Sequence, residues 1–169
     1  MATSSIERVR TAARELGLAI EVREMPASTR TAVDAAAACG CDVDQIVKSL
    51  VFQAAETGDG KELVLLLVSG GNSVDVPRAE KAVGHGLTRA DPKLVKTSTG
   101  FAIGGVSPIG HMHPLRTYID PALLRQPYVW CAAGAPNAVF RCEPDVLSHA
   151  IGAISIEAFA SDVTAITGG

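Results

Sequence analysis

Long apolar runs, an excess of positive charge and a dense set of cysteines are all missing from this chain of 169 residues. No apolar run approaches the roughly 18 to 20 residues that a helix needs to cross a bilayer, and the first residues show no basic flank before an apolar stretch. We therefore expect a cytoplasmic protein without a membrane partner. The chain has four cysteines, Cys39, Cys41, Cys131 and Cys142, and none of them has C-x-x-C spacing. This favours reduced thiols over disulfides or a structural zinc site.

The net charge of −3 argues against nonspecific binding to nucleic acid, so DNA is not an expected partner. Basic residues are nevertheless concentrated in one segment, where only Glu80 and Asp91 oppose Arg78, Lys81, Arg89, Lys93 and Lys96. This segment could be a confined face that binds nucleic acid, or it could be an ordinary solvated helix surface. The sequence alone leaves both interpretations open.

Strands and helices are expected to interleave irregularly in a single domain over residues 1–169, which predicts a mixed α+β fold. Helices are expected near residues 5–16, 31–39, 42–45, 75–82, 91–96 and 144–150. Strands are expected near residues 18–23, 49–54, 62–69, 101–103, 116–119, 128–132, 138–142 and 153–157. Residues 57–60 read as a hairpin turn, and the following run is apolar on both faces, which is typical of a central strand.

The most unusual local feature is the glycine-rich segment at residues 100–110, which contains Gly104, Gly105 and Pro108. Glycine lets a ligand approach the peptide N–H groups closely, so the loop could present main-chain donors to a carbonyl or anionic oxygen. It could equally be a plain turn between two strands.

Lys48 is a second candidate, because it would place an ammonium group beside an apolar strand. That lysine could bind a phosphate or carbonyl, or extend its side chain to solvent.

A protein nucleophile is not expected from the sequence. No nucleophile elbow surrounds Ser107, and Cys131 reads as a buried strand residue. His111 and His113 lie on the same side of an extended segment but lack a third ligand nearby in sequence, so no metal is expected. No cofactor is expected either, although His111 could line a substrate pocket.

Four segments together resemble the YbaK family, which shares its domain with the editing insertion of bacterial prolyl-tRNA synthetases. They are residues 46–50, 87–92, 98–101 and 104–110, and the resemblance extends over roughly residues 5–153. It implies a barrel-like mixed sheet flanked by helices. It also implies hydrolysis of the ester that joins a mistaken amino acid to the terminal adenosine of tRNA, by positioning and electrostatics, assisted by the ribose hydroxyl.

The resemblance also implies roles for particular residues. Lys48 would contact the phosphate or carbonyl region of the substrate, and the main chain from Gly104 and Gly105 to Ser107 would hold the aminoacyl carbonyl and the attacking water. Further substrate contacts would come from Val106, Pro108 and His111. The amino-acid pocket would be lined by Val22, Met25, Thr31, Ala132, Ala133 and Gly134.

The residues that align with this pocket are small where some relatives that remove cysteine carry aromatic residues. We therefore expect alanine, serine, threonine or another small amino acid as the cargo, with cysteine less favoured. Proline tRNA is the expected carrier and prolyl-tRNA synthetase a candidate partner. Two alternatives stay open: a noncatalytic module that binds an aminoacyl or nucleotide group or a synthetase, and a general esterase that uses Ser107.

Overall fold

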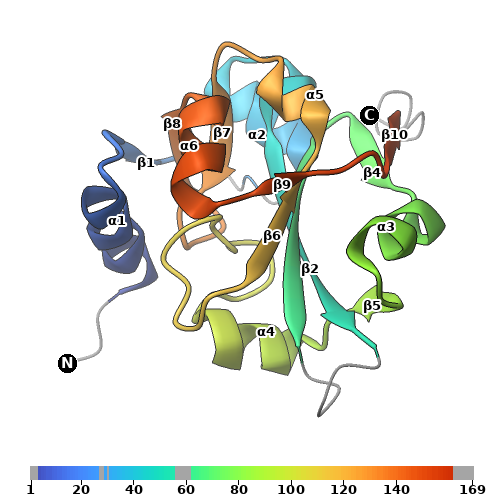
Figure 1. The fold of residues 1–169 in the computed structure, drawn as a ribbon. Coiled ribbons are helices and arrows are strands. Elements are labelled where there is room, and N and C mark those ends of the chain that lie inside the picture. Colours follow the sequence, from blue (N-terminus) through green and yellow to red (C-terminus); the bar gives the residue numbers. More distant parts are fainter. Residues whose placement is uncertain (1–3, 27–28, 30, 56–61, 162–169) are drawn as a thin grey trace.

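The computed structural model describes residues 4–26, 29, 31–55 and 62–161. Its main sheet has the strand order β5-β2-β3-β6-β9, formed by β5 (Leu87–Arg89), β2 (Val47–Ala54), β3 (Leu63–Ser69), β6 (Arg116–Ile119) and β9 (Ile154–Ser155). The sheet is mixed, because β2 pairs antiparallel with β3 and β5, whereas β3 and β9 both run parallel to β6. Figure 1 shows this sheet close to edge-on.

A second sheet has the order β1-β8-β7 and contains β1 (Val22–Glu24), β8 (Ala138–Cys142) and β7 (Val129–Ala132). A bridge between Ile46 and Trp130 joins it to the start of β2, which gives the two sheets a barrel-like arrangement. A short antiparallel pair is formed by β4 (Asn72–Val74) and β10 (Phe159–Ser161).

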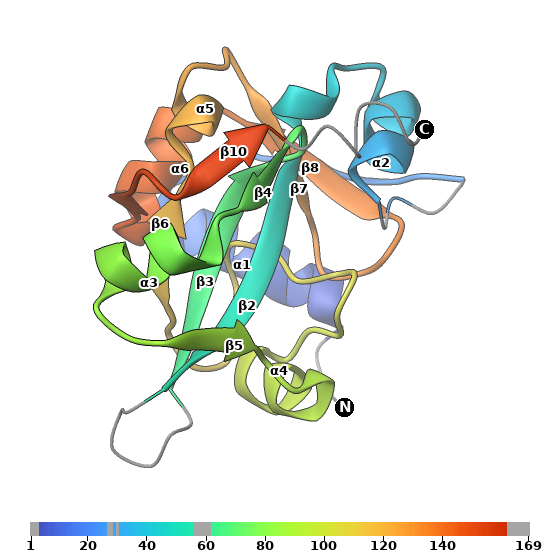
Figure 2. The same cartoon turned by 90° about the vertical axis from the view of Figure 1, so that its right-hand side faces the viewer.

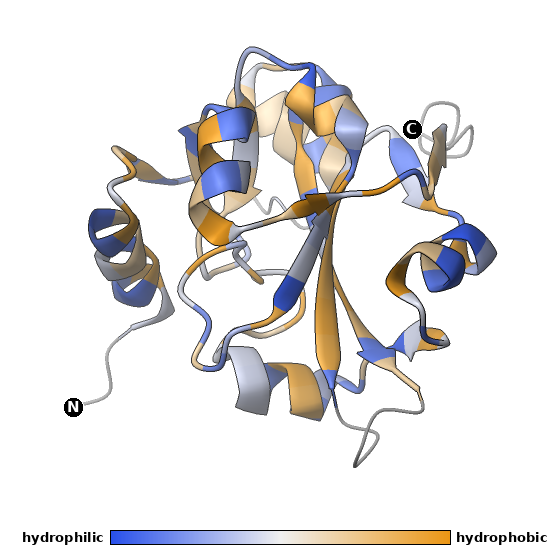
Figure 3. Ribbon diagram, viewed as in Figure 1, coloured by the Kyte–Doolittle hydropathy of each residue, from blue (hydrophilic) through white to orange (hydrophobic). Residues whose placement is uncertain are grey.

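β3 lies at the centre of the hydrophobic core, and all of its residues are buried. Because side chains alternate along a strand, Leu65 and Leu67 pack into one core cluster, and Leu66 and Val68 into another on the opposite face. Helix α1 (Ser5–Leu16) contributes Val9 to the first cluster. Helix α3 (Val76–Val83) covers the second face, as the view in Figure 2 shows. In Figure 3, β3 is hydrophobic, whereas α1 and α3 carry hydrophilic residues on their outer sides.

Side-chain caps explain why the helices begin where they do. Ser4 and Thr31 accept hydrogen bonds from the main-chain N–H groups of Glu7 and Asp34, at the starts of α1 and α2 (Ala32–Cys39). Asp91 caps α4 (Pro92–Thr99), in which proline occupies a first-turn position that needs no N–H donor. The remaining helical segments are η1 (Val43–Gln45), α5 (Pro121–Leu124) and α6 (Pro144–Ile151).

The expected α+β class, the paired strands β2 and β3 and the central position of β3 are confirmed. The expected strand at residues 101–103 is wrong: Phe101 is a fully buried loop residue whose N–H group donates to the Thr99 hydroxyl. The very short elements β4, β5, β10 and α5 were not expected, because three or four residues carry little periodicity.

The hairpin turn at residues 57–60 lies outside the described residues. Within those residues, no helix is both long enough and apolar enough to span a membrane.

Candidate functional site

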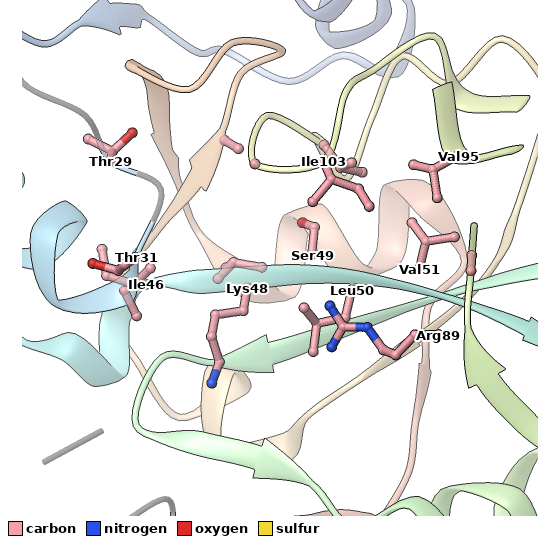
Figure 4. A pocket seen from close by; sticks show the side chains of 16 residues that line it. Thr29, Thr31, Ile46, Lys48, Ser49, Leu50, Val51, Arg89, Val95 and Ile103 are labelled. Atoms are coloured by element: carbon pink, nitrogen blue, oxygen red, sulfur yellow. The ribbon is translucent and has the colours of Figure 1, made fainter. Parts of the chain in front are cut away.

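A pocket of about 250 Å³ lies along one edge of β2. β2 forms its floor, and the glycine-rich loop, the start of α2, β5, α4 and β7 supply the rest of its lining. Figure 4 shows the side chains that surround it. Its lining residues are Thr29, Thr31, Ala32, residues 46–51, Arg89, Ala90, Val95, Ile103, Gly104, Val106 and Ala132.

The pocket exists because β2 is only partly covered along this edge. The strand is bridged to β7 at Ile46 and begins to pair with β5 at Phe52, so the segment between these residues lies in a gap in the sheet. Alternation along β2 gives the gap two chemically different sides. In Figure 4 the side chains of Ser49 and Val51 lie on the side of Ile103 and Val95, whereas that of Lys48 lies on the other side.

The second side of the gap is cationic. Arg89, which stacks over the Phe52 ring at 5.5 Å, reaches the pocket from β5 on the same side of β2 as Lys48. Two positive side chains therefore lie beside an apolar compartment and are separated from it by a single strand. This arrangement suits a ligand that has an anionic part and a small, largely apolar part.

Lys48 is held in place by a short chain of hydrogen bonds. Its ammonium group donates to the main-chain carbonyl of Asn72 on β4. The Asn72 amide donates to the Asp120 carboxylate at 2.8 Å, and the Ser69 N–H group donates to the same oxygen at 3.1 Å. Asp120 is only 2% exposed and also accepts from the N–H group of Ala122, at the start of α5. A buried carboxylate thus fixes the segment that orients Lys48.

Packing and hydrogen bonds hold the glycine-rich loop in place, with Gly104 in the pocket lining. Gly104 has a φ of 98°, a left-handed conformation that favours glycine. A Cβ atom at Gly105 would lie 3.1 Å from the main chain of Ala135, so a side chain there would disturb the packing. On the far side, Arg8 donates to the Gly100 carbonyl at 2.6 Å and lies over the Phe101 ring.

Ser107 and His111 belong to this supporting structure rather than to the pocket lining. Ser107 is fully buried, and its hydroxyl accepts a hydrogen bond from the N–H group of Ile109 at 3.3 Å. The His111 Nε2 atom lies 2.7 Å from the Ser107 carbonyl oxygen. Burial lowers the pKa of His111 below its usual value, with the hydrogen bond to Ser107 opposing this shift. Pro108 and His111 line a different depression, beside α1.

A cysteine nucleophile is disfavoured as well. Cys131 is buried on β7, and burial raises the pKa of its thiol well above the usual value, an effect reinforced by the neighbouring Cys142. A thiol in that environment stays protonated at neutral pH and is shielded from substrate.

The structure brings only some of the expected site residues together. Lys48, Thr31, Gly104, Val106 and Ala132 line the pocket, and Arg89 joins them from the basic segment. The other residues expected to line the amino-acid pocket are not among the described lining of this one. Val22 pairs with Phe140 at the outer strand of the second sheet, and Met25 packs near Trp130. Ala133 is buried in the main core, and Gly134 packs against Ser5.

The other basic residues are exposed and lie outside the pocket lining, on two helices. Arg78 and Lys81 lie on α3, and Lys93 and Lys96 on α4. The Lys96 ammonium also donates to the Gly100 carbonyl at 3.2 Å, which ties α4 to the start of the glycine-rich loop.

Several pocket residues were not expected from the sequence. Ser49, Val51, Val95 and Ile103 form the apolar compartment, and Ile103 is 51% exposed at its rim. The Ser49 Oγ atom is buried and has no hydrogen-bond partner among the described residues. Alternation along the strand that contains Lys48 could have indicated Ser49 and Val51, whereas nothing in the sequence indicates that Val95 meets them.

Comparison with known proteins identifies the family. Residues 26–149 match the family described as the aminoacyl-tRNA editing domain. The uncharacterized protein YwhH of Bacillus subtilis (strain 168) is 31% identical over 145 residues, which cover 86% of this chain and 90% of that protein.

Solved structures agree with this assignment. One, of a protein proposed to be a trans-editing enzyme for prolyl-tRNA synthetase, is 45% identical, with a TM-score of 0.86 over 95% of this chain and 100% of that one. The hypothetical protein APE2540, 24% identical, has the same fold, with a TM-score of 0.81 over 90% of this chain and 99% of that one. This chain therefore belongs to the aminoacyl-tRNA editing domain family, and is of the YbaK type that its motifs indicated.

Proposed function

We propose that residues 1–169 act as one editing domain that hydrolyses the ester between a small, incorrect amino acid and the 3′ end of tRNA, with proline tRNA as the carrier. The observation that carries the proposal is the two-sided pocket at the β2 edge. Its cationic side, its small apolar side and the glycine-rich loop match the phosphate, the amino-acid side chain and the ester of such a substrate.

In this proposal each part of the pocket has a distinct task. Lys48 and Arg89 bind the phosphate and ribose region of the tRNA end. The main chain from Gly104 to Val106 binds the ester carbonyl oxygen as negative charge develops on it. A water molecule adds to the carbonyl carbon, and the bond to the ribose oxygen then breaks. One proton of the water passes to that oxygen, with the neighbouring ribose hydroxyl placed to relay it.

The proposed selectivity is steric. In this proposal the compartment lined by Val51, Val95 and Ile103 accepts a small side chain and excludes the proline ring. A synthetase site built for proline cannot strongly reject a smaller amino acid, so a second, smaller site provides the missing discrimination. The description of the 45%-identical protein supports proline tRNA as carrier and prolyl-tRNA synthetase as a partner.

The rate of ester loss from alanyl-tRNA tests this function against a noncatalytic binding module. A deacylase present in catalytic amounts should release alanine with turnover, far faster than spontaneous hydrolysis. A binding module in stoichiometric excess should leave the spontaneous rate unchanged or slow it by shielding the ester. The second result would reject the proposed hydrolysis.

A further inference from the structure

Ser49 has a hydroxyl group that none of the described residues binds. Its Oγ atom is buried and makes no hydrogen bond to any described residue. A buried hydroxyl is normally paired, because its desolvation is otherwise uncompensated. The other hydroxyl groups in the pocket differ in this respect. Thr29 donates to the Pro136 carbonyl at 2.7 Å, and Thr31 accepts from the Asp34 N–H group at 3.0 Å.

The main chain of Ser49 is directed into the same gap. Gly70 donates to the Ile46 carbonyl and Ala54 donates to the Glu62 carbonyl, so even-numbered residues of this stretch direct their main-chain groups toward β3. Ala90 donates to the Val51 carbonyl from the opposite edge, at 3.2 Å. Main-chain groups alternate in direction along a strand, so those of Ser49 point to the same edge as those of Val51.

This edge has no neighbouring strand at Ser49 within the described residues. The bridge to β7 is at Ile46, and pairing with β5 begins at Phe52. Ser49 therefore presents two acceptor oxygens, its hydroxyl and its main-chain carbonyl, beside a compartment otherwise lined by Val51, Val95 and Ile103.

We infer that Ser49 binds the α-ammonium group of the aminoacyl ester, an inference that rests on the proposed function. Every aminoacyl ester carries this ammonium group whatever its side chain, and its esterified carboxyl group no longer carries a charge. Among the described residues that line the pocket, none is an aspartate or glutamate that could accept from the ammonium group. Two neutral oxygens of one residue then provide its hydrogen bonds, since an unpaired charge in an apolar compartment is strongly disfavoured.

Ser49 thereby becomes a specificity residue that recognises the amino group, whereas the apolar compartment recognises the size of the side chain. The Ser49 hydroxyl can also rotate about its Cα–Cβ bond, so it can turn toward a bound ammonium group without any movement of β2. Removing the hydroxyl should therefore weaken the binding of substrates that have an α-amino group and leave the binding of those that lack one unchanged.

Two non-hydrolysable ligands separate this effect from general damage. Both are tRNAs that end in 3′-amino-3′-deoxyadenosine; one carries alanine through an amide, and the other carries lactic acid, in which a hydroxyl replaces the amino group. The dissociation constants of both ligands are measured for the wild-type protein, Ser49→Ala and Ser49→Thr. We expect Ser49→Ala to raise the dissociation constant of the alanyl ligand about tenfold or more and that of the lactyl ligand less than about threefold. Ser49→Thr, which keeps the hydroxyl, should restore the preference for the alanyl ligand.

The inference is overturned if Ser49→Ala weakens the binding of both ligands equally or weakens the binding of neither. It is also overturned if the wild-type protein fails to bind the alanyl ligand. Parallel deacylation of alanyl-tRNA by the wild-type protein tests the proposed function separately. A protein that binds the alanyl ligand through Ser49 but releases no alanine would refute hydrolysis and leave the role of Ser49 intact.

Discussion

The ammonium group of Lys48 donates a hydrogen bond to the main-chain carbonyl of Asn72, two strands away in sequence on β4. This bond orients the lysine along the cationic side of the pocket, and Asp120 in turn holds Asn72. In the proposed function, the positive charge of Lys48 binds the phosphate and ribose region of the tRNA end.

Lys48→Ala should therefore lower kcat/KM for alanyl-tRNA by about tenfold or more, because a charge-assisted contact is lost. Lys48→Arg keeps the charge, so its kcat/KM should lie between those of the wild-type protein and Lys48→Ala. Single-turnover deacylation checks this, with Arg125→Ala as the control, since it removes one exposed positive charge just after α5 and outside the pocket lining. Deacylation by Lys48→Ala at the wild-type rate would remove Lys48 from the mechanism.

Ser107→Ala should leave deacylation within about threefold of wild type. The Ser107 side chain is fully buried and its hydroxyl accepts a hydrogen bond from the Ile109 N–H group, so its loss should lower the free energy of unfolding by about 1 kcal/mol. Urea unfolding and deacylation of alanyl-tRNA measure the two effects. A folded Ser107→Ala protein without any activity would instead favour the esterase mechanism, as would wild-type turnover of simple esters that lack tRNA.

Ile103→Ala should relax the size limit of the pocket. Ile103 is 51% exposed at the pocket rim, so the change should disturb folding little while it enlarges the compartment. We expect the ratio of kcat/KM for valyl-tRNA over alanyl-tRNA to rise about tenfold, the value of one or two methylene groups in an apolar site. Met112→Ala, at an exposed apolar residue outside the pocket, is the control. An unchanged ratio in Ile103→Ala would contradict the assignment of this compartment.

Charge reversal at both Lys81 and Lys93 should weaken tRNA binding and flatten its salt dependence. These exposed residues lie on α3 and α4, outside the pocket, where they would contact the acceptor-stem backbone. Losing two phosphate contacts should reduce the slope of log K against log salt by about 2. A matched double reversal at Arg14, on α1, and Arg125, just after α5, changes the net charge equally at other exposed positions. If both double variants give the same slope, Lys81 and Lys93 are ordinary solvated residues that do not contact tRNA.

The burial of His111 predicts a pH dependence of stability. Its pKa is lowered in the folded protein, so below about pH 6.5 the unfolded chain binds a proton that the folded chain does not. The free energy of unfolding should therefore fall as pH drops from about 6.5 toward the folded-state pKa. In His111→Gln this part of the pH dependence should disappear, as measured by urea unfolding at about pH 7.5 and 5.5. His113→Gln, at an exposed histidine, should keep the wild-type profile; equal profiles for both variants would refute the prediction.

The sequence predicted the elements that carry strong local signals. Ser4, Thr31 and Asp91 cap helices because their side-chain oxygens bind nearby N–H groups, an effect confined to a few residues. The central position of β3 followed from its unbroken apolar run. Residues 101–103 read as a strand for the same reason, since a buried loop residue such as Phe101 has the same local pattern.

The site was less predictable because its residues meet only through the tertiary structure. Lys48 and the loop at Gly104 were indicated by motifs, and both line the pocket. The apolar compartment was not, because Val95 reaches it from a helix whose other residues are largely exposed. Nor could the sequence show that Val22 would be placed on the outer strand of the second sheet, since short strand pairings are decided by long-range packing.

The most direct test of the central claim is the rate of amino-acid release from proline tRNA charged in turn with alanine, serine, threonine, cysteine and proline. We predict fast release of one or more of the small amino acids alanine, serine and threonine, with prolyl-tRNA left intact. Release of cysteine alone, equal release of proline, or no release above the spontaneous rate would contradict a small-amino-acid editing site at the β2 edge.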